Sequence, residues 1–153
     1  MELPPAGGHH DEREIEAVVD VLRNGTLDIG PAVAEMERGT AELLAKRRGV
    51  MVNSGSSALR LSIDLLGLEA GDEILTSPLT FSTDIAPMVQ SGLVPVFADV
   101  DSGSYQIDPN RMAEMIGPRT RAILAPNLCA VSYTHLRAHE TERLISYAVF
   151  CLK

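Results

Sequence analysis

The sequence predicts an α/β domain whose mostly parallel sheet is covered by helices on both faces. Short apolar runs alternate with helical patterns over most of the chain, which is the arrangement that crossovers between parallel strands require. Clusters of Gly, Asp and Pro separate these segments and supply the turns. With 153 residues, of which 45% are hydrophobic, the chain has the length of one domain and enough apolar residues for a packed core.

The N-terminal region predicts a loose arm followed by one helix. Residues 1–10 are rich in Pro and Gly and end in two histidines. A helix is expected from Asp11, because acidic residues fill its first turn and Asn24-Gly25 supplies a stop signal. Its apolar residues recur at helical spacing, namely Ile15, Val18, Val19 and Leu22.

A second helix is expected from about Pro31 to Arg47. It would place the basic run Lys46-Arg47-Arg48 at its C-terminus, where cations interact favourably with the helix dipole. The apolar run of residues 49–52 comes next and is interpreted as a strand. The sequence therefore predicts that a strand leads directly into the segment that begins at Asn53.

Residues 53–60 combine a small-residue turn with the start of a further helix. Gly55 would let a ligand approach the backbone closely, and the hydroxyls of Ser56 and Ser57 can donate to phosphate oxygens. The N–H groups of the first helical turn carry partial positive charge, so the turn suits a phosphate. Neither common glycine-rich phosphate motif is present. The alternative is an ordinary N-capped helix, because Ser is common at helix starts.

The rest of the chain continues the alternation of strands and helices. Parallel strands end at one edge of their sheet, and ligands bind at that edge. We therefore expect the turn at 53–57, the loop at 77–81, Asp99–Asp101 and Asn127 to meet at one rim. The expected elements are a strand at 74–76, a helix at about 82–91, a strand at 94–98, a helix at about 109–116 and a strand at 120–126.

Composition argues against several classes of function. The net charge of −8, with a single short basic cluster, disfavours a nucleic-acid surface. No apolar stretch approaches the roughly 20 residues that span a bilayer, and the start lacks the features of a secretory signal, so a soluble, cytoplasmic protein is expected. Cys129 and Cys151 form neither a CxxC motif nor a disulfide framework. His135 and His139 lack the zinc-protease motifs, so no metal site is expected.

Several short motifs, in order over roughly 100 residues, resemble the DegT/DnrJ/EryC1/StrS sugar aminotransferases, which are pyridoxal-phosphate enzymes of fold type I. The resemblance implies that residues 11–130 form the N-terminal part of an aspartate-aminotransferase-like large domain, truncated relative to the family. The matching pieces are Asn24-Gly25, Gly30-Pro31, Asn53–Leu59, Gly71–Ile74, Thr80-Phe81, Gly92, Pro95–Phe97, Asp99–Asp101 and Tyr105–Asp108.

The resemblance also assigns site residues. Ser56 and Ser57, next to Gly55, match the positions that hold the phosphate of pyridoxal 5′-phosphate. Phe81 matches the aromatic ring that stacks on the pyridine, a role that overrides the usual interpretation of such a ring as core. The segment from Leu27 to Pro31 would line the substrate entrance near a neighbouring subunit. Asp99 and Asp101 are interpreted as structural turn caps.

For the parent protein, the resemblance implies a homodimer that transfers an amino group from a donor such as glutamate to a nucleotide-linked keto-sugar. The motif Pro87–Phe97 is also similar to lipopolysaccharide enzymes of the same family, the NDP-4-keto-6-deoxyhexose 3-dehydratases, in which a histidine replaces the lysine that holds the cofactor. That residue is expected beyond this chain, so no catalytic residue is assigned and no turnover is expected. A non-catalytic anion-binding α/β module is the remaining alternative.

The character of the sequence changes near residue 131. Residues 131–153 are similar to a peptide that arises when sequencing-adapter DNA is translated, and we interpret them as a non-native tail. Residues 145–152 are apolar enough to form a strand or a helix.

Overall fold

The computed structural model describes residues 10–25, 29–127 and 147–151. The chain divides into two compact units, Met1–Met51 and Val52–Lys153. Among the described residues, the first unit contains two helices, and the second contains a sheet with three further helices. Each unit is described by itself below.

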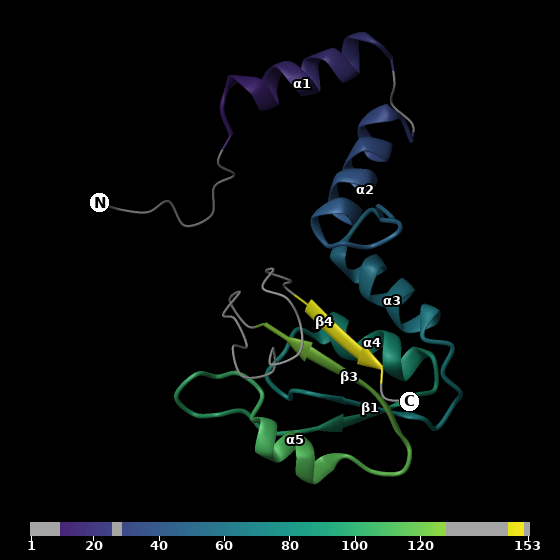
Figure 1. Cartoon of the computed structure of the whole chain (residues 1–153), viewed down its shortest axis with the longest axis vertical. Coiled ribbons are helices and arrows are strands. Elements are labelled where there is room, and N and C mark those ends of the chain that lie inside the picture. The colour runs from purple at the N-terminus through teal and green to yellow at the C-terminus, as the bar shows by residue number, and fades with distance from the viewer. Residues whose placement is uncertain (1–9, 26–28, 128–146, 152–153) are drawn as a thin grey trace. The chain divides into compact units, whose positions relative to one another are not determined.

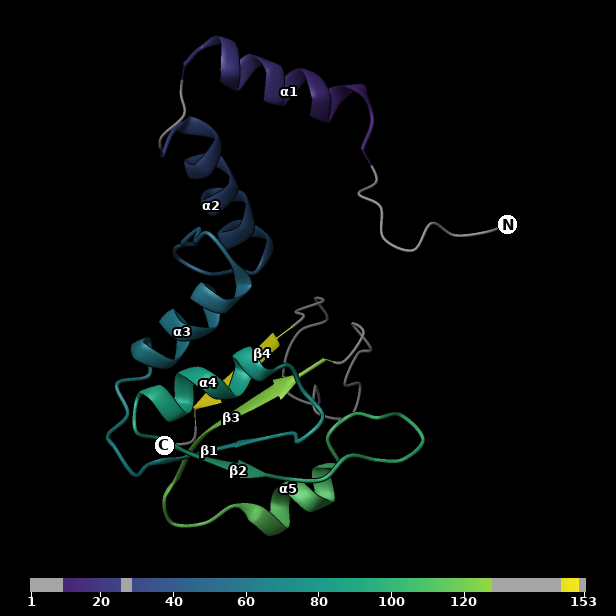
Figure 2. The same cartoon turned by 180° about the vertical axis from the view of Figure 1, so that it is seen from behind.

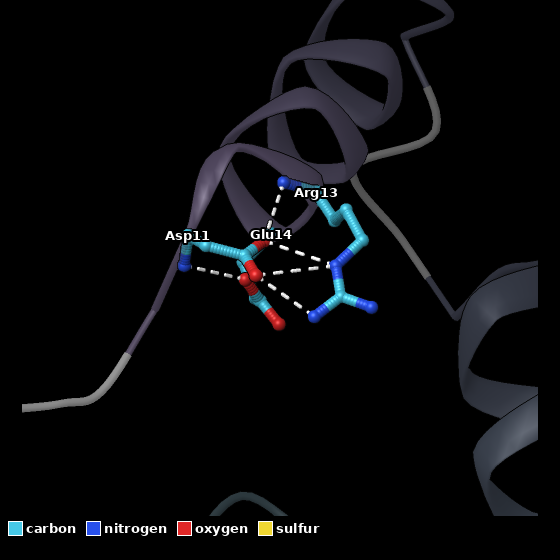
Figure 3. Close-up of polar contacts among 3 residues, drawn as sticks. All are labelled: Asp11, Arg13 and Glu14. Carbon is cyan, nitrogen blue, oxygen red and sulfur yellow. Dashed lines mark hydrogen bonds and ion pairs between the residues drawn. The ribbon is translucent and has the colours of Figure 1, made fainter.

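Helix α1, Glu12–Arg23, begins and ends where the sequence predicts. Figure 3 shows its first turn, in which Asp11 and Glu14 form a reciprocal capping box. The N–H of Arg13 donates to Asp11 Oδ1 over 2.9 Å, and the N–H of Asp11 donates to Glu14 Oε2 over 2.7 Å. Gly25 follows the helix with a φ of 68°, the left-handed conformation that glycine adopts most easily.

Helix α2, Pro31–Leu43, ends four residues before the predicted boundary. Ala45 has a φ of 51°, which a right-handed helix cannot contain, and the N–H of Lys46 turns back to the carbonyl of Ala41 over 2.8 Å. The prediction of a helix up to Arg47 is therefore wrong. Lys46-Arg47-Arg48 follows the helix and does not form its last turn.

The strand predicted at residues 49–52 is absent from the described structure. Val50 and Met51 are 67% and 45% exposed, and the N–H of Met51 donates to the side chain of Glu37 over 2.8 Å. A strand requires a neighbouring strand to satisfy its backbone groups, and no described strand lies beside this segment. The apolar run alone was not sufficient evidence for a strand.

The second unit is built on a four-stranded sheet (Figure 1). Its strands are β1 (Glu73–Thr76), β2 (Val94–Phe97), β3 (Thr120–Pro126) and β4 (Tyr147–Cys151), in the spatial order β2-β1-β3-β4. Strands β1, β2 and β3 are parallel, and β4 pairs antiparallel with β3. The predicted mostly parallel sheet is confirmed.

Helices cover both faces of this sheet, as the sequence predicts. On one face, α3 (Gly55–Leu65) and α4 (Ser82–Gln90) pack on Ile74 and Leu124, and on the other, α5 (Pro109–Met115) packs on Leu75 and Ile123. Figure 2 shows α4 and α5 on opposite sides of the strands. Neighbouring strand residues therefore belong to different cores, because successive side chains point to opposite faces.

Strand β4 falls within the tail that we interpret as non-native, where the sequence is apolar enough for a strand or a helix. Its residues pair with Ala122–Pro126 of β3. The rest of the tail after residue 130, including His135 and His139, lies outside the described residues. No helix among the described residues is long and apolar enough to cross a membrane.

Candidate functional site

The carboxyl ends of three parallel strands meet at one edge of the sheet. Thr76 at the end of β1 lies opposite Phe97 of β2 and Leu124 of β3. The chain leaves β1 toward α4 on one face and leaves β2 toward α5 on the other. In open α/β sheets, ligands bind outside the carboxyl ends of strands whose connections leave toward opposite faces. The 77–81 loop and Asp99 follow these two ends, as predicted, and Asn127 follows β3.

The turn at 53–57 begins helix α3, which packs beside α4 on one face of the sheet. Ser54 is the N-cap of α3: its hydroxyl accepts from the N–H of Ser57 over 3.2 Å, and its carbonyl accepts from the N–H of Ala58 over 3.0 Å. The N–H groups of Gly55 and Ser56 precede the first bond of the helical ladder. They carry the partial positive charge of the helix terminus and can donate to an anion.

The two serines of this turn differ in how their hydroxyls are used. The hydroxyl of Ser57 donates to Asn53 Oδ1 over 2.6 Å, so its proton is already engaged inside the turn. Ser56 is exposed, and its hydroxyl has no hydrogen-bond partner within the described part of the chain. Ser56 can therefore donate to a ligand directly, whereas Ser57 must first release Asn53. Asn53 was not among the predicted site residues, although an amide four residues before a serine could have signalled it.

Gly55 lies where a ligand could approach the backbone. A Cβ added to Gly55 would meet no atom within 4 Å, and its φ is not in the left-handed region. The fold itself therefore does not require glycine at this position. The open space lies at the first turn of α3, next to the two N–H groups that could receive an anion.

The 77–81 loop presents Phe81 at the rim. The hydroxyl of Ser77 accepts from the N–H of Leu79 over 3.1 Å, which closes a small turn at the start of the loop. Phe81 occupies the N-cap position of α4, and the residue is 69% exposed. Such a ring does not belong to the core and is available to a flat ligand.

Asp84 is a buried carboxyl in the first turn of α4, and sequence reasoning missed it. The residue is 1% exposed, and its Oδ2 accepts a hydrogen bond from the hydroxyl of Thr80. Burial raises the pKa of Asp84, while the bond from Thr80 acts in the opposite direction. Its position could have signalled it, because Asp84 precedes the buried Met88 by one helical turn.

Asp101 caps the turn that follows it, as predicted, whereas the carboxylate of Asp99 accepts from the next residue. Asp99 Oδ1 accepts from the N–H of Val100 over 2.8 Å. Asp101 Oδ1 accepts from the N–H groups of Gly103 and Ser104 over 3.2 and 2.8 Å. Hydrogen bonds from Ser104 hold the pKa of Asp101 below its ordinary value. The expected substrate entrance falls partly outside the described residues, since Leu27 is not described.

Within residues 10–25, 29–127 and 147–151, no group of three or more His, Cys, Asp or Glu side chains could hold a metal ion. The described candidates for a site are the uncovered N-terminus of α3 and the exposed ring of Phe81.

Comparison with known proteins gives a consistent result. The sequence profile of the DegT/DnrJ/EryC1/StrS aminotransferase family matches residues 9–134. The chain is 38% identical over 113 residues to the spore coat polysaccharide biosynthesis protein SpsC of Bacillus subtilis. It is 31% identical over 122 residues to the UDP-4-amino-4-deoxy-L-arabinose–oxoglutarate aminotransferase of Shewanella sediminis. These alignments cover 74% and 80% of the chain.

A solved structure supports the same relationship. The GDP-4-keto-6-deoxy-D-mannose 3-dehydratase of E. coli, with bound hydrated pyridoxal phosphate, superposes with a TM-score of 0.78 at 32% identity over 82% of the chain. This chain spans 34% of that protein, and 29% and 31% of the two curated relatives. The similarity therefore extends over most of this chain but over only about a third of each relative.

Proposed function

The chain belongs to the DegT/DnrJ/EryC1/StrS aminotransferase family, and from this premise we propose that it binds pyridoxal 5′-phosphate at the carboxyl edge of its sheet. The E. coli dehydratase that superposes on this chain holds that cofactor. When bound, the cofactor supplies an electron-accepting ring for chemistry at an amino or keto carbon. Residues 11–130 would form the corresponding part of the large domain.

The observation that carries this proposal is the capped N-terminus of α3. The N–H groups of Gly55 and Ser56 would donate to the cofactor phosphate, together with the hydroxyl of Ser56. The hydroxyl of Ser57 would join them after releasing Asn53. The dianionic phosphate is stabilised by the positive end of the helix dipole, and the open space beside Gly55 gives it access.

Phe81 would hold the pyridine ring. The residue is exposed in the loop that follows β1, and offset stacking on a flat heterocycle is favourable. The phosphate turn and this ring belong to the second unit, in which α3 and α4 pack together.

For the whole protein we propose amino-group transfer to a nucleotide-linked keto-sugar, with a donor such as glutamate, in a cytoplasmic homodimer. Support comes from the Shewanella relative, whose name contains both a nucleotide-linked amino sugar and an oxoglutarate partner. A 3-dehydratase acting on an NDP-4-keto-6-deoxyhexose is the second candidate, favoured by the superposition on the E. coli enzyme. A lysine at the cofactor would favour transamination, because only lysine can hold the cofactor covalently, and a histidine would favour dehydration.

A binding experiment tests the cofactor proposal. We would titrate the chain with pyridoxine 5′-phosphate, which lacks the aldehyde and therefore cannot react with Lys46 or Lys153, and with pyridoxine as the phosphate-free control. The chain should prefer the phosphorylated compound, and the double substitution of Ser56→Ala and Ser57→Ala should remove most of that preference. Equal affinity for the two compounds would contradict the proposed phosphate site.

The same titration distinguishes a cofactor site from the alternative of a non-catalytic anion-binding module. A simple anion-binding module would bind inorganic phosphate and pyridoxine 5′-phosphate with equal affinity, because it would not contact the pyridine ring. The Phe81→Ala substitution should weaken binding of the pyridoxine compound only. The 153-residue chain is expected to bind without turnover, so sugar amination by this chain would contradict our assignment of the catalytic residue to the longer protein.

A further inference from the structure

The orientation of Phe81 needs a structural cause. The residue is 69% exposed, so its orientation depends on the backbone that carries it. On its C-terminal side, Phe81 is fixed as the N-cap of α4, where its carbonyl accepts from the N–H of Asp84 over 2.9 Å. On its N-terminal side lies Thr80, whose side chain is bonded to the same Asp84. The backbone hydrogen bond of Phe81 and the side-chain hydrogen bond of Thr80 therefore both have Asp84 as their partner.

The first half of the loop has its own support. Ser77 is buried, and its hydroxyl accepts from the N–H of Leu79 over 3.1 Å. Beyond Leu79, the bond between Thr80 and Asp84 is the side-chain link that ties the loop to α4 among the described residues. Without that bond, residues 79 and 80 would connect a fixed turn to a fixed helix with no side-chain restraint.

Asp84 occupies its position at a cost in stability. Its Oδ1 is buried and has no hydrogen-bond partner within the described part of the chain, and the same holds for Thr76 Oγ1. Burial of a carboxyl with an unpaired oxygen is unfavourable, and this burial also raises its pKa. A residue that destabilises the fold yet holds the loop beside Phe81 fits a positioning role better than a purely structural one.

The geometry of α4 explains how Asp84 reaches the loop. Asp84 precedes Met88 by four residues, about 6 Å along the helix, and Thr76 follows Ile74 by two residues, about 6.6 Å along the strand. Because α4 connects the parallel strands β1 and β2, it runs antiparallel to them. Its first turn, which contains Asp84, therefore lies toward the carboxyl end of β1, where the 77–81 loop begins.

We propose that Asp84 is a positioning residue, which holds Thr80 and thereby fixes the ring of Phe81 at the rim of the sheet. This inference depends on the proposed function only for the purpose of the ring, which would be to stack on the cofactor. The fixed ring itself can be tested without any cofactor. Substitution of Asp84 would leave the turn at residues 53–57 unchanged, because among the described residues Asp84 bonds Thr80 and Phe81 and not that turn.

The chain offers a clean probe, since it contains no tryptophan. A Phe81→Trp variant places a single indole at this position, and its fluorescence anisotropy and quenching by acrylamide report how freely the ring moves. In this background, Thr80→Val removes the hydroxyl and keeps the shape of the side chain. Thr80→Ser and Asp84→Asn are the conservative controls, because both retain a donor and an acceptor for the bond.

Thr80→Val should raise the population of mobile indole about fivefold, because the loss of one hydrogen bond shifts an equilibrium by about that factor. Thr80→Ser and Asp84→Asn should leave it unchanged. Thr80→Ala replaces Thr80→Val if the valine variant does not fold, because Thr80 is only half-buried. An indole that moves equally freely with and without the hydroxyl, or that is loosened as much by Thr80→Ser, would overturn the proposal.

A second readout separates this inference from the proposed function. Pyridoxine 5′-phosphate should bind the unsubstituted chain, and Thr80→Val should weaken that binding several-fold while the affinity for inorganic phosphate stays the same. A merely structural role would lower the melting temperature and weaken both ligands together, which would count against positioning. If the pyridoxine compound does not bind at all, the proposed function fails, whereas the indole measurement still decides the role of Asp84.

Discussion

The hydroxyl of Ser57 donates to Asn53 Oδ1 over 2.6 Å, and this bond ties the first turn of α3 to the residue that precedes its cap. Ser54 lies between them, with its own hydroxyl 3.1 Å from Ser57 Oγ. Three polar side chains therefore support one another around the start of the helix. The turn has its shape before a ligand arrives, so binding an anion costs little ordering of the backbone.

The cap of α3 can be tested by Ser54→Ala. The substitution removes the acceptor for the N–H of Ser57, and we expect it to lower the free energy of unfolding by about 1 kcal/mol. Urea unfolding followed by circular dichroism measures the loss. Ser56→Ala is the matched control, since the Ser56 hydroxyl has no partner among the described residues, and it should change stability by less than about 0.5 kcal/mol. Equal losses in the two variants would contradict the assigned cap.

Gly55→Ala should separate folding from ligand binding. A methyl group at Gly55 meets open space, so the variant should fold with unchanged or slightly higher stability. The same methyl group would enter the space in front of the free N–H groups and should weaken binding of pyridoxine 5′-phosphate. Gly39→Ala in α2 also meets open space and should leave binding unchanged. Undiminished binding by Gly55→Ala would argue against a ligand at this turn.

The start of β1 depends on an ion pair that is partly buried. Glu73 Oε1 lies 2.9 Å from a terminal nitrogen of Arg119, and the hydroxyl of Thr120 donates to Glu73 Oε2 over 3.3 Å. Because the Glu73 side chain is only 13% exposed, Glu73→Gln should cost about 1 to 2 kcal/mol of unfolding free energy.

The control for this ion pair is Glu114→Gln. Glu114 pairs with Arg111 at 3.0 Å, but both side chains are more than half exposed, so the loss should stay below about 0.5 kcal/mol. Denaturant unfolding of the two variants side by side gives the comparison. If Glu73→Gln lowers the free energy of unfolding less than Glu114→Gln does, burial does not determine how much these ion pairs stabilise the fold.

Asp84 should make stability depend on pH. Burial raises its pKa in the folded chain, whereas in the unfolded chain it ionises near its ordinary value. The favourable contribution of the neutral carboxyl is therefore fully present below the ordinary pKa and is lost as pH rises through the raised pKa. Asp84→Asn removes the charge but keeps an acceptor for Thr80, so at pH 7 it should raise the melting temperature by about a few degrees.

Melting curves of the two proteins between pH 4 and pH 8 measure this difference, which should shrink toward acidic pH. Asp101→Asn provides the opposite case. Hydrogen bonds from Ser104 lower the pKa of Asp101, so its contribution is present above the ordinary pKa and is lost as pH falls through the lowered value. A gap between wild type and Asp84→Asn that is constant across this pH range would show that Asp84 does not titrate as described.

The sequence predicted most elements of the second unit because their signals are local. The runs at Ile74–Thr76 and Thr120–Pro126 are apolar and bounded by turn residues, and both form strands. The stop at Asn24-Gly25 and the acidic start at Asp11 fixed the bounds of α1 in the same way. The errors arose where an element depends on a partner. Residues 49–52 have the composition of a strand, but no described strand lies beside them.

Within the site, small residues at a helix start are a local pattern, and they identified Gly55, Ser56 and Ser57 as candidates. Phe81 was assigned only through the family resemblance, because an aromatic residue after a strand is by itself more often part of the core. Whether these residues bind the cofactor stays a prediction. Only the tertiary structure showed that the Ser57 hydroxyl is already engaged by Asn53 and that Asp84 is buried against the loop that carries Phe81. Burial and hydrogen-bond partners depend on packing between segments, which spacing along the chain does not contain.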